Sequence, residues 1–187
     1  MSDLNVLFDQ LEAFRLAPID NWKPVRIIDI DIRIAANGDW FYLGSPIQRH
    51  RIVKLFSSVL RLEGNQYFLI TPLVKYRIQV DDVPFIAVEM NQVKEQVKQK
   101  EIQKLYFRTN MDEVILADHI HPLTVITNAK NSEPSPYITV RSELKAKITR
   151  SVFYQLAELL QPDPNQSDAT TTVGVFSAGE FFAFGTA

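Results

Sequence analysis

The residues that most clearly suggest chemistry are basic side chains at a predicted helix start. Arg49 and Arg51 flank His50 directly before an apolar stripe with helical spacing, and Arg150 precedes a second such stripe. Free amides at a helix N-terminus and guanidinium groups both attract anions, so these segments are candidate phosphate or carboxylate sites. The alternative is that the arginines pair with acids such as Asp29 or face water, as surface cations commonly do.

Aromatic residues lie close to both basic segments. Trp40 and Tyr42 precede the first segment, and Tyr137 precedes the second. They could supply apolar contact to a ligand that the arginines hold, or stack on bases of a nucleic acid. The alternative is that they belong to the core faces of strands, where aromatic residues are common.

A second group with chemical potential contains two histidines. His119 and His121 lie two residues apart, which places both on one face of an extended segment. Asp118 or Glu113 could complete a metal site for a metal-assisted hydrolase. Two histidines without a fixed third ligand are also typical of polar turns, so no metal, cofactor or catalytic residue is assigned.

Other motifs of catalysis are absent from the sequence. There is no Gly-x-Ser-x-Gly elbow, Walker loop, Rossmann fingerprint or His-Glu-x-x-His motif, and only six glycines occur in 187 residues. Asp29 and Asp31 share a predicted strand face with Arg33, which indicates an ion-pair ladder rather than an acid–base pair.

Composition indicates an ordinary globular protein. The net charge is −2, from 20 basic and 22 acidic side chains, so no global field recruits nucleic acid or anionic lipid. The absence of cysteine excludes disulfides and thiolate chemistry. The sequence shows neither a signal peptide nor an apolar run long enough for a membrane span, so we expect a cytoplasmic protein without a membrane partner.

The first basic segment lies inside a predicted strand–helix–strand unit. We expect strands over 40–43 and 67–70, with a helix between them that stops near Gly64. Shifting the chain by about one hundred residues aligns Ile47 with Ile148 and Arg49 with Arg150, and aromatic strands again follow. The apolar stripe of the first helix consists of Ile52, Leu55, Phe56, Val59 and Leu62.

This repetition predicts an α+β fold of duplicated strand–helix–strand units, packed as two half-domains over 1–80 and 81–187. The N-terminal half-domain begins with a helix that ends before Pro18. Isoleucines alternate with charged residues over 25–35, which predicts a strand with one buried face. Residues 91–104 fit either a helix or a charged hairpin tip, and 128–136 form the best linker candidate.

The ordered set of motifs resembles a bacterial family called domain of unknown function 1285. The motifs include DIDIRI, DWFYLGSPIQR, YFLITP, VDDVPFIAVEM, FRTNMDEV and the VFYQL helix, and the likeness covers about residues 17–186. The resemblance implies a C-terminal half similar to pleckstrin-homology-like barrels. It also implies ligand binding at the junction of the halves, in signal transduction. It brings no catalytic residue or cofactor.

Three functional hypotheses follow from the sequence. The first is a non-enzymatic module that binds an anionic peptide, nucleotide or nucleic acid between the halves, through Arg49, Arg51 and Arg150. In this hypothesis Trp40, Tyr42 or Tyr137 gives apolar contact. The second is the hydrolase that uses His119 and His121. The third is an assembly protein in which two copies pair as a homo-oligomer.

Overall fold

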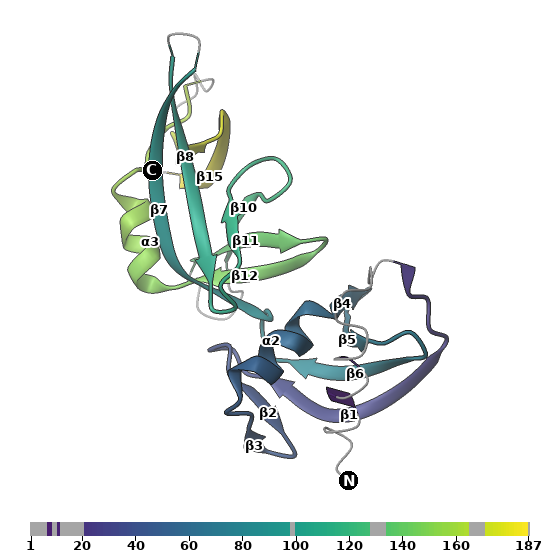
Figure 1. Cartoon of the computed structure of the whole chain (residues 1–187). Coiled ribbons are helices and arrows are strands. Elements are labelled where there is room, and N and C mark those ends of the chain that lie inside the picture. The colour runs from purple at the N-terminus through teal and green to yellow at the C-terminus, as the bar shows by residue number, and fades with distance from the viewer. Residues whose placement is uncertain are drawn as a thin grey trace. The chain divides into compact units, whose positions relative to one another are not determined.

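The chain divides into two compact units in a computed structural model. The boundary follows Pro84, so that the first unit is Met1–Pro84 and the second is Phe85–Ala187 (Figure 1). The structure describes residues 7, 8, 11, 21–97, 100–127, 134–164 and 171–186. None of the helices within these residues is long and apolar enough to cross a membrane.

The first unit contains a six-stranded sheet and one short helix. The strands run in the order β3-β2-β1-β6-β5-β4. All neighbours are antiparallel except β1 and β6, which are parallel. The elements are β1 (Arg26–Ile34), β2 (Trp40–Tyr42), β3 (Ser45–Pro46), α2 (His50–Ser58), β4 (Leu60–Glu63), β5 (Gln66–Ile70) and β6 (Val74–Val80).

The second unit contains a six-stranded sheet, one helix and a smaller sheet of three strands. The larger sheet has the order β10-β11-β12-β7-β8-β9, and the smaller one β13-β14-β15. Its helix α3 spans Arg150–Ala157. The strands are β7 (Phe85–Val97), β8 (Lys100–Thr109), β9 (Val114–Leu116), β10 (Leu123–Thr127), β11 (Pro134–Arg141), β12 (Leu144–Ile148), β13 (Gln161–Pro162), β14 (Thr172–Ser177) and β15 (Glu180–Thr186).

The two larger sheets have the same topology. Read from its other edge, the second sheet is β9-β8-β7-β12-β11-β10, which repeats the first sheet strand for strand. In both sheets the first and sixth strands form the parallel pair. A duplicated two-part arrangement is therefore confirmed, but α2 lies between the third and fourth strands whereas α3 follows the sixth. The predicted alignment of Ile47 with Ile148 and of Arg49 with Arg150 does not hold.

Several predicted elements differ from the observed ones. The described residues are mostly β, with only α2 and α3 as full helices, so the α+β class is too rich in helix. Helix α2 ends at Ser58 rather than near Gly64, because β4 pairs with β5 across a two-residue turn that Gly64 opens at a φ of 60°. Leu62 fits the apolar stripe of a longer helix, but it also alternates with Leu60 as in a strand. Pairing with β5 selects the strand.

Residues 91–97 and 100–104 belong to two paired strands, β7 and β8, so the sequence alternative of a charged hairpin holds for the described residues and the helix does not. Strands β7 and β8 form a long two-stranded ribbon (Figure 1). Lys94 pairs with Glu101 at 3.0 Å and Lys104 with Glu95 at 2.6 Å across the ribbon. The predicted linker over 128–136 is part of β11 from Pro134 onward, and its earlier residues lie outside the described ones. The predicted leading helix is described only at Leu7, Phe8 and Leu11, all helical.

A buried hydroxyl joins two strands of the second unit, β14 and β8, to the residue that follows β9. Ser177 on β14 is fully buried. Its Oγ accepts a hydrogen bond from the Leu105 amide at 2.9 Å and donates one to the Ala117 carbonyl at 2.6 Å. Both backbone groups lie away from water, so the hydroxyl is their partner in place of solvent.

Replacing Ser177 with Ala should lower the stability of the second unit by about 2–3 kcal/mol, since two buried backbone groups lose their partner. Chemical denaturation followed by far-UV circular dichroism measures this change. Ser151→Ala, at an exposed position of α3, is the control and should shift the free energy of unfolding by less than about 0.5 kcal/mol. Equal midpoints for the two variants would contradict the bridging role.

Candidate functional site

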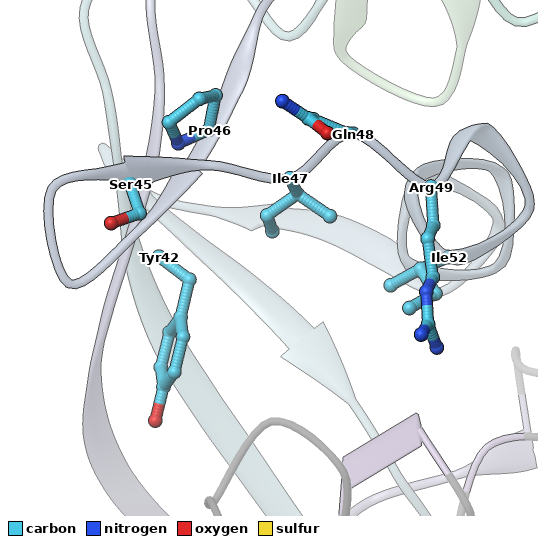
Figure 2. Close-up of a pocket in the computed structure, with 7 residues that line it drawn as sticks. All are labelled: Tyr42, Ser45, Pro46, Ile47, Gln48, Arg49 and Ile52. Atoms are coloured by element: carbon cyan, nitrogen blue, oxygen red, sulfur yellow. The ribbon is translucent and has the colours of Figure 1, made fainter.

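A surface pocket in the first unit brings together two of the predicted site residues, Tyr42 and Arg49. It has a volume of about 290 Å³. Figure 2 shows the Tyr42 ring and the Arg49 side chain extending to the same side of the chain, with Ile47 between them. We call it the Arg49 pocket. Its lining consists of Tyr42, Ser45, Pro46, Ile47, Gln48, Arg49 and Ile52.

A tight turn between β2 and β3 sets one wall of the Arg49 pocket. Tyr42 pairs with Ser45, and the two residues between them, Leu43 and Gly44, have φ of 49° and 74°. These values are typical of the turns that fit the twist of a hairpin. Leucine rarely adopts a positive φ, so a locally strained backbone lies at the rim of the pocket. The Ile47 amide then donates to the Trp40 carbonyl at 2.8 Å, which holds the return strand.

The start of helix α2 forms the opposite wall. Arg49 is its N-cap residue, in an extended conformation, and its side chain makes no capping hydrogen bond within the described part of the chain. The Arg49 carbonyl accepts from the amides of Ile52 at 2.9 Å and Val53 at 3.2 Å. The apolar face of the helix, including Ile52 and Phe56, is buried and anchors it to the unit.

The start of helix α3 is satisfied within the chain. Its N-cap is Thr149, whose Oγ1 accepts from the Val152 amide at 3.5 Å. Threonine is a favoured N-cap residue, whereas arginine is not. The two basic helix starts that the sequence predicted to be alike therefore differ. Among the described residues, Thr149 caps α3 with its side chain and Arg49 does not cap α2.

The remaining predicted site residues of the first unit lie outside the Arg49 pocket. Trp40 is only 2% exposed and packs on Phe56 of α2, with ring centroids 6.3 Å apart. Its indole nitrogen is buried and finds no hydrogen-bond partner in the part of the chain that the structure describes. Arg51 is exposed on α2 but is not part of the lining. Ligand contact by Trp40 would require the residue to leave the core.

Two predicted site residues belong to the second unit. Arg150 is exposed at the first position of α3, and Tyr137 is a buried residue of β11. Participation of either residue in a ligand site stays a prediction.

Sequence reasoning missed most of the pocket lining. Ser45 and Pro46 form β3, and Gln48 lies in the short connection from β3 to α2; nothing in their types marks them as functional. The dipeptide Leu43-Gly44 was the available signal, because a glycine-containing turn between aromatic residues can double the chain back toward a following helix.

A larger pocket of about 490 Å³ lies on the same sheet, at a register shift between β1 and β6. Asp29 and Arg77 line it and bind each other, Nε to Oδ1 at 2.5 Å and Nη2 to Oδ2 at 2.9 Å. These hydrogen bonds lower the pKa of Asp29. The sequence predicted that Asp29 would form an ion pair with Arg33, and this pairing is wrong. Asp29 forms its ion pair with Arg77 on the neighbouring strand, and Nη2 of Arg33 lies 3.9 Å from Oδ2 of Asp81. The guanidinium of this pocket is thus already engaged.

The histidine pair does not assemble a metal site among the described residues. No group of three or more histidine or carboxylate side chains is close enough there to hold an ion. Glu113 binds Arg141 through both carboxylate oxygens, at 2.6 and 2.8 Å. Asp118 accepts from the amides of Ile120 and His121, each at 2.9 Å, and thereby closes the turn. Both candidate third ligands therefore have structural partners.

Asp118 should contribute pH-dependent stability. Partial burial works against its charged form, but the amide hydrogen bonds outweigh that effect and lower the pKa of Asp118. A carboxyl with a lowered folded pKa stabilises the fold above its unfolded pKa of about 4 and loses that contribution as the pH falls further.

Asp118→Ala should therefore cost about 1 kcal/mol near neutral pH, and the difference from the wild type should narrow below pH about 4. Urea denaturation across the pH range measures it. Glu143→Ala, at an exposed turn position, is the control with little expected effect. A difference that stays constant down to the lowest pH would contradict this role of the carboxylate.

The geometry defines a mostly β protein of two units with an anion-compatible pocket in the first. Two family models match it consecutively. "Domain of unknown function (DUF1285), N-terminal domain" matches residues 17–83, and "Protein of unknown function (DUF1285), C-terminal domain" matches residues 84–184. The chain belongs to the DUF1285 family, as its motifs indicated. No curated protein matches the sequence.

Two solved structures of the family resemble the chain. A DUF1285 family protein from Silicibacter pomeroyi DSS-3 is 37% identical, with a TM-score of 0.79, and the match covers 91% of this chain and 88% of that one. A DUF1285 family protein from Shewanella baltica OS155 is 28% identical, with a TM-score of 0.50, over 68% of this chain and 90% of that one. Both support the observed fold.

Proposed function

We propose that this protein is a non-enzymatic ligand-binding module that takes an anionic group in the Arg49 pocket. The observation that carries the proposal is the uncapped start of α2, where a favoured capping residue is replaced by an arginine. A cation at a helix N-terminus opposes the helix dipole and costs a few tenths of a kcal/mol. An anion at this position would suit both the positive end of the helix dipole and the guanidinium of Arg49.

The state of Arg49 supports the proposal. Its side chain is exposed, and it takes part in none of the hydrogen bonds or ion pairs found among the described residues. By contrast, Arg33, Arg77, Arg108 and Arg141 each have a carboxylate partner. An arginine of a pocket wall without such a partner is suited to bind an external carboxylate or phosphate through its two-pronged donor geometry.

The wider expectations from the sequence remain predictions. These are a signalling role, a pleckstrin-homology-like second unit, cytoplasmic location, pairing of two copies, and contributions of Arg150, Trp40 and Tyr137 to a shared site. The contribution predicted for Arg51 is not part of this proposal, because Arg51 does not line the Arg49 pocket. The ligand classes in question are anionic peptides, nucleotides and nucleic acids.

A panel of anions tests the proposal. Nucleotides, phosphorylated metabolites, short acidic peptides and oligonucleotides should include at least one ligand that raises the melting temperature of the wild type. Arg49→Ala should weaken that ligand about tenfold or more, because a charge-assisted hydrogen bond contributes roughly 1.5–3 kcal/mol. Calorimetric titration measures the affinity.

Arg51→Ala is the matched control for this panel, since Arg51 lies on the same helix turn but outside the lining. It should leave the affinity nearly unchanged. If no ligand of the panel binds, or if both variants lower the affinity equally, the assignment of the Arg49 pocket is overturned.

Replacing Arg49 with a residue that caps the helix should raise the stability of the first unit and abolish anion binding. Arg49→Asp places a favoured N-cap side chain, and an acid that suits the helix dipole, at a position that already has cap geometry. We expect a gain of about 0.5–1.5 kcal/mol in the free energy of unfolding and loss of anion binding. Tryptophan fluorescence reports the first unit, because both tryptophans, Trp22 and Trp40, belong to it.

Arg49→Gln is the control, because it removes the charge without providing a good cap. It should lose binding with little change in stability. A loss of stability in Arg49→Asp would show that Arg49 supports the fold itself, which contradicts a functional reason for the uncapped helix.

A further inference from the structure

We infer that the Arg49 pocket is built for a single carboxylate carried on an apolar body, rather than for a polyphosphate. This inference rests on the proposed function and narrows the chemical class of its ligand. It follows from the charge, the size and the lining of the pocket.

The charge of the lining matches one negative charge. Among the described residues that line the pocket, Arg49 is the sole cation and none is acidic. The next basic residues of α2 are His50, Arg51 and Lys54, which lie outside the lining and each have an interaction of their own. A triphosphate brought here would keep most of its charge uncompensated, whereas one guanidinium fork matches one carboxylate.

The size and polarity of the pocket limit the rest of the ligand. A volume of about 290 Å³ corresponds to about ten water molecules, which is room for a small acid or for the anionic end of a larger ligand. Ile47 and Ile52 supply aliphatic surface, and the ring of Tyr42 faces the same side as Arg49 (Figure 2). An aromatic or aliphatic group attached to the carboxylate would cover these three side chains.

The same chemistry occurs in free small acids and at peptide C-termini. The test therefore titrates the full chain with 3-phenylpropionate and with a tetrapeptide that ends in phenylalanine. Their neutral amides, 3-phenylpropionamide and the C-terminally amidated tetrapeptide, serve as matched ligands without the charge. ATP and inorganic phosphate represent the competing class. Calorimetry or ligand-observed NMR measures each affinity.

We expect one of the two carboxylates to bind at least about tenfold more tightly than its amide and than ATP. Arg49→Ala should abolish this preference. Arg49→Lys, which keeps the charge but not the planar fork, should lower it severalfold. Tyr42→Ala should weaken the carboxylate and its amide equally, because it removes apolar contact alone. The better carboxylate, free or peptide-borne, identifies the source.

The outcomes separate this inference from the proposed function. Binding of ATP or phosphate that depends on Arg49, without carboxylate preference, would overturn the inference and leave the anion pocket standing. Binding that is indifferent to Arg49, or no binding of any probe, would overturn both. Since Arg49 is exposed and outside the core, its variants should fold, and circular dichroism verifies this.

Discussion

The parallel pairing of β1 with β6 is the constraint on which the first unit depends. Parallel neighbours cannot be joined by a tight turn, so the chain between them must cross over. This crossover contains β2, β3, α2, β4 and β5. The apolar face of α2 covers the sheet, and its Phe56 packs against Trp40 of β2. This route sets the position of α2, and its N-cap residue Arg49 therefore lies in one pocket with Tyr42 and Ser45, which flank the turn between β2 and β3. The Arg49 pocket is a consequence of that meeting.

The second unit repeats the pairing without repeating the pocket. Its first and sixth strands, β7 and β12, are again parallel, but the helix follows the sixth strand instead of lying between the two meanders. The start of α3 is capped by Thr149, and Arg150 follows it on the surface. The two units thus share a topology but differ in the placement of the helix. They also differ in its N-cap residue, because Thr149 makes a side-chain cap hydrogen bond and Arg49 makes none among the described residues.

The sequence predicted much of this arrangement, for identifiable reasons. The alternation of isoleucines predicted β1, and helical spacing predicted the body of α2. Arg49 and Tyr42 were both singled out by their types, and they do line one pocket. The end of α2 and the correct alignment of the two units depend on strand pairing over long sequence distances, which local periodicity does not encode. The burial of Trp40 likewise follows from packing on Phe56 rather than from its neighbours in sequence.

The central claim is that the Arg49 pocket, at the start of α2, is an anion-binding site confined to the first unit. Its most direct test is an amide NMR spectrum of the isotopically labelled full chain, recorded during titration with 3-phenylpropionate and, separately, with inorganic phosphate. We predict that the largest shifts under at least one of these probes fall within residues 42–53, around the Arg49 pocket. Shifts that cluster in residues 85–187, or no saturable shifts with either probe, would contradict the account.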